Sequence, residues 1–151
     1  MFSLTIEYAM RAVLALASGD GTPMTTRRIA EVMRVPQSYL SKVLQSLVKG
    51  GLVYSTRGLK GGFVLVSKPE EISMLDILNA VSPIKRIEHC PLDLEGHSSK
   101  LCPLHRRLDQ AMAMVQEAFA KTTLDEILSE ENPCPTLQEQ LTLLKPLENL
   151  E

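Results

Sequence analysis

The chain has 151 residues, a formal net charge of -2 and 44% hydrophobic residues, so it can form one compact domain or one small domain with a helical arm. No window approaches 18 uninterrupted apolar residues, and Glu7 and Arg11 interrupt the apolar start, so we expect neither a membrane span nor a targeting segment. Three cysteines are too few for a secreted disulfide framework, which favours a cytoplasmic location, and without a phosphate loop, a nucleophile elbow or a zinc-helix motif we do not expect an enzyme.

Three helical patterns occupy the first fifty residues, over residues 3–18, 26–33 and 37–49. The first has an apolar surface wider than one stripe, which predicts either an internal helix or a dimerisation element. Pro36 separates the second pattern from the third, because a proline disfavours helical geometry at the preceding residue and can itself start a helix. The apolar face of the third helix is expected to hold Leu40, Val43, Leu44, Leu47 and Val48.

A hairpin pattern follows directly. Residues 52–56 and 62–66 are rich in β-branched and aromatic residues and predict two short strands, joined by a loop that contains Gly58, Gly61 and Gly62. Helix, turn, helix and hairpin is the order of a winged helix. We therefore predict a mainly α fold with a small β-hairpin wing, in which a winged helix-turn-helix DNA-binding domain carries a long dimerisation helix.

The charge distribution also predicts DNA binding. Between Arg27 and Lys68 there are eight basic residues and one acidic residue, a net charge of +7 in an acidic chain, which is typical of a phosphate-binding surface. The polar face of residues 37–49 suits a major groove, and Arg57 at the wing tip suits a minor groove. The predicted DNA contacts are Arg27, Arg28, Gln37, Ser38, Tyr39, Ser41, Lys42, Arg57, Gly58 and Lys60.

The second half of the chain is acidic, with 15 acidic and 7 basic residues from Pro69 onward. A helix is expected to open at residues 68–71 and run to Val81, followed by a loop of about 20 residues. From Pro103 a long helical pattern carries an apolar stripe with no partner left in so small a fold, which predicts dimerisation. The expected regions are a DNA-binding domain (1–81), a cysteine-containing sensor loop (82–103), the dimerisation helix with a short helix (104–131) and a tail (132–151).

A cluster of cysteines and histidines lies in and just after the loop. Cys90, Cys102 and His105 have the spacing Cys-x11-Cys-x2-His, and His97 lies between the two cysteines. Two cysteines and neighbouring histidines indicate a metal or cluster site, although the spacing matches no tetrahedral zinc motif. The alternative is that both cysteines are inert thiols and both histidines are ordinary surface residues.

The helical patterns, the hairpin and the cysteine-histidine spacing together resemble the IscR/NsrR/CymR family of bacterial winged-helix regulators. The resemblance covers nearly the whole chain, from residues 7–12 (EYAMRA) to residues 102–104 (CPL) and the helix beyond. It is carried most specifically by residues 39–47 (YLSKVLQSL), 50–53 (GGLV) and 57–65 (RGLKGGFVL).

The resemblance implies a 2Fe-2S cluster. Cluster-binding members have the pattern Cys-x5-Cys-x5-Cys, and IscR-like members add a histidine three residues later; this chain matches at Cys90, Cys102 and His105 but has Gly96 at the middle position. The fourth ligand would then be Glu7 of the facing subunit, at the place where some relatives supply a carboxylate, in preference to His97. Mixed thiolate and imidazole ligation occurs in known 2Fe-2S centres.

We therefore expect a homodimeric regulator, acting as a repressor, that binds an inverted-repeat operator in double-stranded DNA and senses redox state, nitric oxide or iron-sulfur status at residues 90–105. One alternative is a cluster-free regulator controlled by a thiol switch between Cys90 and Cys102 or by a protein partner. Another is an iron-sulfur or metal protein whose winged helix makes protein contacts, which the basic segment argues against.

Overall fold

The computed structural model describes residues 3–90, 101–131 and 134–144. Its elements are, in chain order, α1 (Leu4–Ser18), α2 (Thr26–Met33), α3 (Gln37–Lys49), β1 (Val53–Thr56), β2 (Gly62–Leu65), a 3-10 turn (Pro69–Glu71), α4 (Met74–Val81), α5 (Pro103–Lys121), α6 (Leu124–Leu128) and α7 (Pro135–Thr142). The predicted mainly α fold with a two-stranded antiparallel wing is confirmed. None of the described helices is long and apolar enough to cross a membrane.

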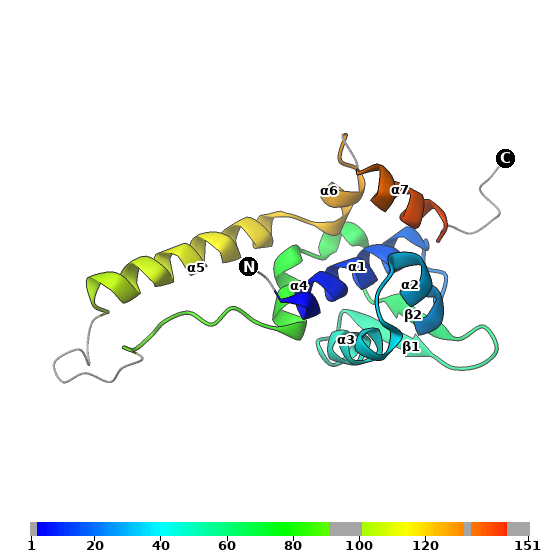
Figure 1. Ribbon diagram of the computed structural model, residues 1–151, viewed down its shortest axis with the longest axis horizontal. Helices are drawn as coiled ribbons and strands as arrows, with labels where there is room; N and C mark the ends of the chain where they lie inside the picture. Colours follow the sequence, from blue (N-terminus) through cyan, green and yellow to red (C-terminus); the bar gives the residue numbers. More distant parts are fainter. Residues whose placement is uncertain (1–2, 91–100, 132–133, 145–151) are drawn as a thin grey trace.

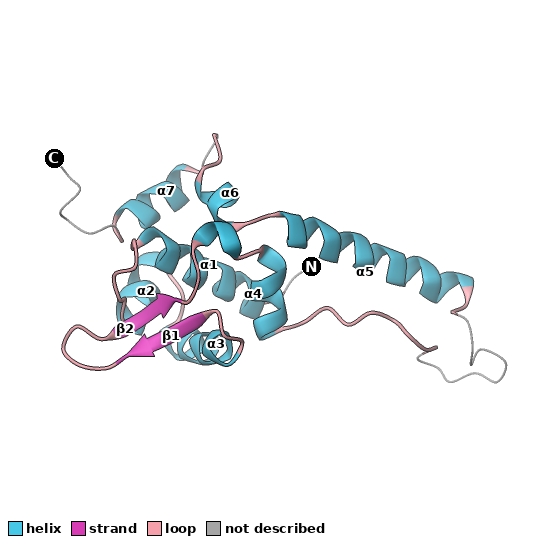
Figure 2. Ribbon diagram, turned by 180° about the vertical axis from the view of Figure 1, so that it is seen from behind, coloured by secondary structure: helices cyan, strands magenta, loops and turns pink. Residues whose placement is uncertain are grey.

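Helix α1 is the centre of the core. It contacts α2, α3, α4, α6, α7 and β2, and Figures 1 and 2 show these elements gathered around it. Ala9, Ala12 and Ala15 are fully buried, and side chains this small let neighbouring helices approach the α1 backbone closely. We call this part of the molecule, residues 4–81 with α6 and α7, the body.

The turn between α2 and α3 is set by local chemistry. The side chain of Thr25 caps α2 by accepting a hydrogen bond from the Arg28 backbone N–H (3.2 Å). Arg34 ends α2 in the left-handed region, at φ 53°, and Pro36 stands immediately before α3. On α3, Leu40, Val43, Leu44 and Leu47 are buried as expected, whereas Val48 is 37% exposed, because the helical repeat places it at the edge of the face that these four residues form.

The wing is joined to the body at Met24. Strand β2 pairs with β1 from Val53↔Leu65 to Thr56↔Gly62, and Phe63 also exchanges two backbone hydrogen bonds with Met24 (2.8 and 3.1 Å). A Cβ atom at Gly62 would lie 2.6 Å from the Met24 backbone. The close approach of the two chains therefore requires glycine at this position.

The helix expected to open at residues 68–71 begins later. Residues 69–71 form a 3-10 turn, Ile72 is extended, and α4 starts after Ser73, which caps it in a box with Asp76. The reason is tertiary. Ile72 is buried, its carbonyl accepts a hydrogen bond from the Leu124 N–H (3.0 Å), and Ser73 lies in a β-bridge with Thr123, so this segment pairs with a chain 50 residues away instead of continuing a helix.

Helix α5 projects from the body on the side opposite the wing loop (Figures 1 and 2). It contacts α4 and has no buried residue along its 19 positions. The segment after α4, residues 83–90, runs out beside it; we call this segment the strap, and α5 with the strap the arm. Leu104, Leu108 and Met114 on α5 are 63%, 46% and 70% exposed.

Candidate DNA-binding surface and cysteine-histidine cluster

Helix α3 presents a polar face to solvent. Its four core residues fix its rotation, and Gln37, Ser38, Tyr39 and Lys42 are exposed as a result, while Ser41 is half-buried and donates from Oγ to the Gln37 carbonyl (3.0 Å). Tyr39 also packs edge-to-face on Tyr8 of α1, with the ring centroids 6.1 Å apart. The arrangement leaves a row of small polar side chains and one ammonium group available to a groove.

The wing tip carries Arg57, Gly58, Leu59 and Lys60, all exposed. Gly58 has φ 109°, which only glycine adopts readily. The base of the loop is held by Thr56, whose Oγ1 accepts a hydrogen bond from the Gly62 N–H (3.1 Å). Sequence reasoning missed Leu59, which is fully exposed. A leucine between Arg57 and Lys60 is itself a signal, because minor-groove proteins use apolar side chains beside their basic contacts.

The two predicted contacts on α2 are engaged within the chain. Arg27 forms an exposed ion pair with Glu31 (2.8 Å), and the Arg28 guanidinium donates to the Leu143 carbonyl at the end of α7 (2.5 Å). Both side chains remain solvent-exposed. Exposed ion pairs contribute little to stability, so Arg27 can leave Glu31 for a phosphate at small expense.

The structure brings Cys90, Cys102 and His105 together. Nδ1 of His105 lies 3.3 Å from Cys102 Sγ and 3.9 Å from Cys90 Sγ, so the two sulfur atoms are no farther apart than the sum of these distances. All three side chains are half-buried, and both thiols are free. We call these three residues the cysteine-histidine cluster.

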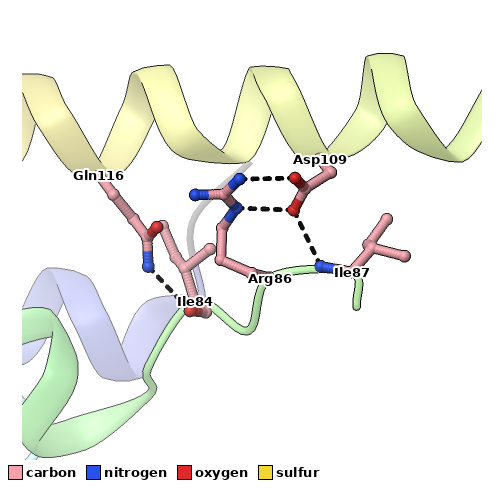
Figure 3. Close-up of polar contacts among 5 residues, drawn as sticks. All are labelled: Ile84, Arg86, Ile87, Asp109 and Gln116. Carbon is pink, nitrogen blue, oxygen red and sulfur yellow. Dashed lines mark hydrogen bonds and ion pairs between the residues drawn. The ribbon is translucent and has the colours of Figure 1, made fainter. Parts of the chain in front are cut away.

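A polar clasp holds the strap against α5 and so positions Cys90. Figure 3 shows Arg86 pairing with Asp109 through two hydrogen bonds (2.6 and 2.5 Å), while Asp109 Oδ1 also accepts from the Ile87 N–H (2.9 Å) and Gln116 donates to the Ile84 carbonyl (3.0 Å). The Arg86 hydrogen bonds lower the pKa of Asp109 from 3.8 to about 2.

Sequence reasoning missed this clasp. Asp109 lies one turn after His105 on α5, and Gln116 lies two turns after Asp109. All three residues therefore share one face of the helix. A lone carboxylate one turn after a candidate ligand, beside two arginines at 106 and 107, was the available signal. Its partner Arg86 is 23 residues away, which no local pattern reveals.

The other predicted ligands do not complete the cluster within one chain. Glu7 lies exposed on α1 and pairs with Arg11 (2.9 Å), with no contact to the cluster among the described residues. His97 and Gly96 lie outside the described residues. Within the parts of the chain that the structure describes, no group of three or more His, Cys, Asp or Glu side chains is arranged so that it could hold a metal ion. The described residues of one chain therefore do not form a complete metal site at the cysteine-histidine cluster.

Known proteins with similar sequences and folds are transcriptional regulators. The model of the Rrf2 family, described as iron-dependent transcriptional regulator, matches residues 2–130. A protein of Aquifex aeolicus assigned as a helix-turn-helix-type transcriptional regulator is 30% identical over 134 residues, which are 87% of this chain and 93% of that protein. A Mycobacterium tuberculosis protein with the same assignment is 32% identical over 130 residues, 83% of this chain and 79% of that protein.

Two solved structures extend the similarity to three dimensions. CymR, described as the global cysteine regulator of B. subtilis, superposes with a TM-score of 0.70 at 30% identity, over 87% of this chain and 98% of CymR. IscR of T. potens superposes with a TM-score of 0.68 at 26% identity, over 87% of this chain and 88% of IscR. The similarity covers the body and the arm alike.

Proposed function

Because this chain belongs to the Rrf2 family of transcriptional regulators, which bind DNA and are not enzymes, we propose that it is a homodimeric repressor that binds an inverted-repeat operator through α3 and the wing. The cysteine-histidine cluster sets its affinity for that operator. The observation that carries the proposal is the convergence of two thiols on one imidazole nitrogen, at the free end of a helix with an uncovered apolar face. We place this regulator in the cytoplasm, where its operator is.

The DNA-binding half rests on the exposed face of α3 and the basic wing tip. Two copies related by a two-fold axis would present two α3 helices to successive major grooves and two wings to the flanking minor grooves. We assign Lys42 to a phosphate contact and Arg57 to a minor groove. These assignments predict different behaviour for two variants.

Operator titrations by fluorescence anisotropy test them. Arg57→Ala should weaken binding to the upstream region of the protein's own gene by about 1–3 kcal/mol, and Lys42→Ala should weaken binding to all sequences and reduce the salt dependence. Lys49→Ala, which removes an exposed lysine outside the predicted contacts, is the matched control. If Arg57→Ala binds as tightly as Lys49→Ala at one salt concentration, Arg57 does not contact the operator.

A 2Fe-2S cluster is the first chemistry proposed for the sensor. The thiol groups of Cys90 and Cys102 and the imidazole of His105 are donors of the kind that hold such clusters, but a 2Fe-2S cluster takes four protein ligands. Glu7 of the second copy is our proposed fourth ligand, which would make the site incomplete without dimerisation. When bound, the cluster supplies sensitivity to oxygen, nitric oxide and iron supply; the residues of the chain supply the donors and, through the clasp, the position of Cys90.

A thiol switch is the second candidate, and a specific observation favours it. Nδ1 of His105 lies beside both thiols, at 3.3 Å from Cys102 Sγ and 3.9 Å from Cys90 Sγ, so one ring atom holds the two sulfur atoms near each other. Oxidation by a peroxide or a diazene removes two electrons and two protons from the pair and joins Cys90 to Cys102. Bond formation requires the sulfur atoms to approach to about 2 Å, which would draw the strap toward the start of α5.

Iron and sulfide analysis after anaerobic reconstitution distinguishes the 2Fe-2S cluster from the thiol switch. The parent should bind iron and acid-labile sulfide, Cys90→Ala/Cys102→Ala should not, and Cys134→Ala, which removes the third cysteine, should behave like the parent. If the parent binds no more iron than the double variant, the iron-sulfur assignment is wrong. Mass spectrometry after mild oxidation should then find a Cys90–Cys102 disulfide together with altered operator affinity, and its absence would remove the thiol switch as well.

A further inference from the structure

A cavity lies between α1, α4, α6 and α7, away from the exposed face of α3, the wing tip and the cysteine-histidine cluster; Glu7, the proposed fourth ligand, is one of its lining residues. Its volume is ≈ 560 Å³, within the range of small-molecule sites. Helix α7 forms one wall, and α7 lies beyond residue 130, where the match to the family ends. Figure 1 shows α7 lying over α1 near α2.

Most of the lining is apolar, from Leu14, Met74, Leu124, Ile127 and Leu137. The exception that points to a ligand is Gln140. This side chain is only 8% exposed, lines the cavity, and its amide makes no hydrogen bond with any described residue. A buried amide without a partner is costly, and such groups in native structures are usually satisfied by a bound molecule or water.

The charges around the cavity leave one cation available. Glu7 neutralises Arg11 in an ion pair (2.9 Å), whereas Arg34 makes no ion pair within the described residues. Arg34, Thr136 and Gln140 also line a neighbouring cavity between α2 and α7, so these three lie together at the α2 side. The other charged residues of that neighbouring cavity are Arg28, Glu31 and Glu139. The apolar residues of α4 and α6 line the first cavity and not the neighbouring one. The cavity therefore has a cationic, hydrogen-bonding end and an apolar end.

We propose that this cavity binds a small amphipathic carboxylate. Arg34 and the amide N–H groups of Gln140 donate hydrogen bonds to the carboxylate, which gives the donors of the buried amide a partner and pairs the free cation. Leu124, Ile127 and Leu137 surround the aliphatic chain of the ligand. The size of the cavity suits a chain of about eight carbons better than a two-carbon acid or a long lipid.

Isothermal titration calorimetry of the full-length dimer with octanoate tests this, using octan-1-ol as the neutral molecule of the same length. Octanoate should bind with 1:1 stoichiometry per chain, and octan-1-ol about tenfold or more weakly. Arg34→Asn, which removes the cation but keeps a residue that tolerates the left-handed backbone, should weaken octanoate about tenfold and leave octan-1-ol unchanged. Lys49→Gln, which removes a distant lysine, is the control and should match the parent.

Leu137→Trp, which fills the apolar end, should abolish binding of both probes. Three results would overturn the proposal: no octanoate binding to the parent dimer, equal affinity for octanoate and octan-1-ol, or octanoate binding that neither Arg34→Asn nor Leu137→Trp changes. Binding to a monomeric variant but not to the dimer would also overturn it, because the second copy would then be the occupant. The titrations contain neither DNA nor iron, so their outcome is independent of the proposed regulatory function.

Discussion

The body and the arm are held together by different forces. In the body, six helices and strands pack around α1, and Ile29, Met33, Leu44 and Leu47 are fully excluded from water. In the arm, α5 buries none of its residues, and the strap is fixed by the clasp of Arg86 on Asp109. Hydrophobic burial is the main favourable term in folding, so the body can be stable alone.

The arm is different because its apolar face remains uncovered. A helix of 19 residues with exposed Leu104, Leu108 and Met114 is marginal in water by itself. A second copy packed along this face would supply the missing burial. This difference predicts that the part carrying the proposed DNA-binding elements is self-sufficient, whereas the part carrying the cysteine-histidine cluster depends on assembly. Such an arrangement would suit the proposed sensor.

The largest expected effect is in the core of the body. Leu44→Ala removes a fully buried side chain and should lower the free energy of unfolding by about 2–5 kcal/mol. Leu59→Ala, at the fully exposed wing tip, is the matched control and should change it by less than about 0.5 kcal/mol. Urea denaturation followed by circular dichroism measures both. Similar losses for the two variants would contradict the self-sufficient body.

Charges on the arm should act on assembly instead. Met112→Glu or Val115→Glu places a carboxylate in the apolar stripe of α5, at positions that are half-buried in one chain. Either variant should raise the dissociation constant of the dimer by a factor on the order of 100, because dimerisation would then bury an unpaired charge. Gln110→Glu, at an exposed position, is the control. Sedimentation equilibrium gives the constants; a Met112→Glu protein as dimeric as the parent would place the interface elsewhere.

A smaller effect is expected where the wing joins the body. Gly62→Ala puts a methyl group 2.6 Å from the Met24 backbone, and the displacement of β2 should lower the free energy of unfolding by about 1–3 kcal/mol. Operator affinity should fall as well, because the wing tip moves with β2. A thermal melt and an operator titration measure the two consequences, and an unchanged melt would mean that β2 can move without loss.

The smallest effect on overall stability should come from the clasp. Asp109 has a folded pKa of about 2, below its ordinary value of 3.8, so its ionised form contributes stability above pH 4, and that contribution is lost as the pH falls through 2. Asp109→Asn should remove the same contribution to stability at neutral pH. It should also speed amide hydrogen exchange at Ile87 about tenfold, while exchange in the body stays unchanged. Glu117→Gln, which removes an exposed pair with Lys121, should leave that exchange rate as it is.

The order of the helices and strands in the DNA-binding part of the body follows from local sequence patterns. Residues 26–33 and 37–49 show apolar periodicity and a proline between them, and the hairpin shows glycines between β-branched runs; each signal lies within about ten residues, so the sequence alone predicts the winged helix. The position of α5 and its uncovered face were predictable for the same reason. Cys90, Cys102 and His105 were identifiable from residue type, and their convergence was expected from the resemblance.

Contacts between distant segments required the tertiary structure. Ile72 is extended because it pairs with Leu124, Asp109 is held by Arg86 from the strap, and Gln140 is buried because α7 lies over α1. In each case the partners are 20 or more residues apart, and their meeting depends on how whole elements pack. Local patterns are enough to predict most of the elements and the chemical groups that they carry. Which of those groups meet, and where α4 begins, depends on how the elements pack, because burial and hydrogen bonding between distant residues have no local periodicity.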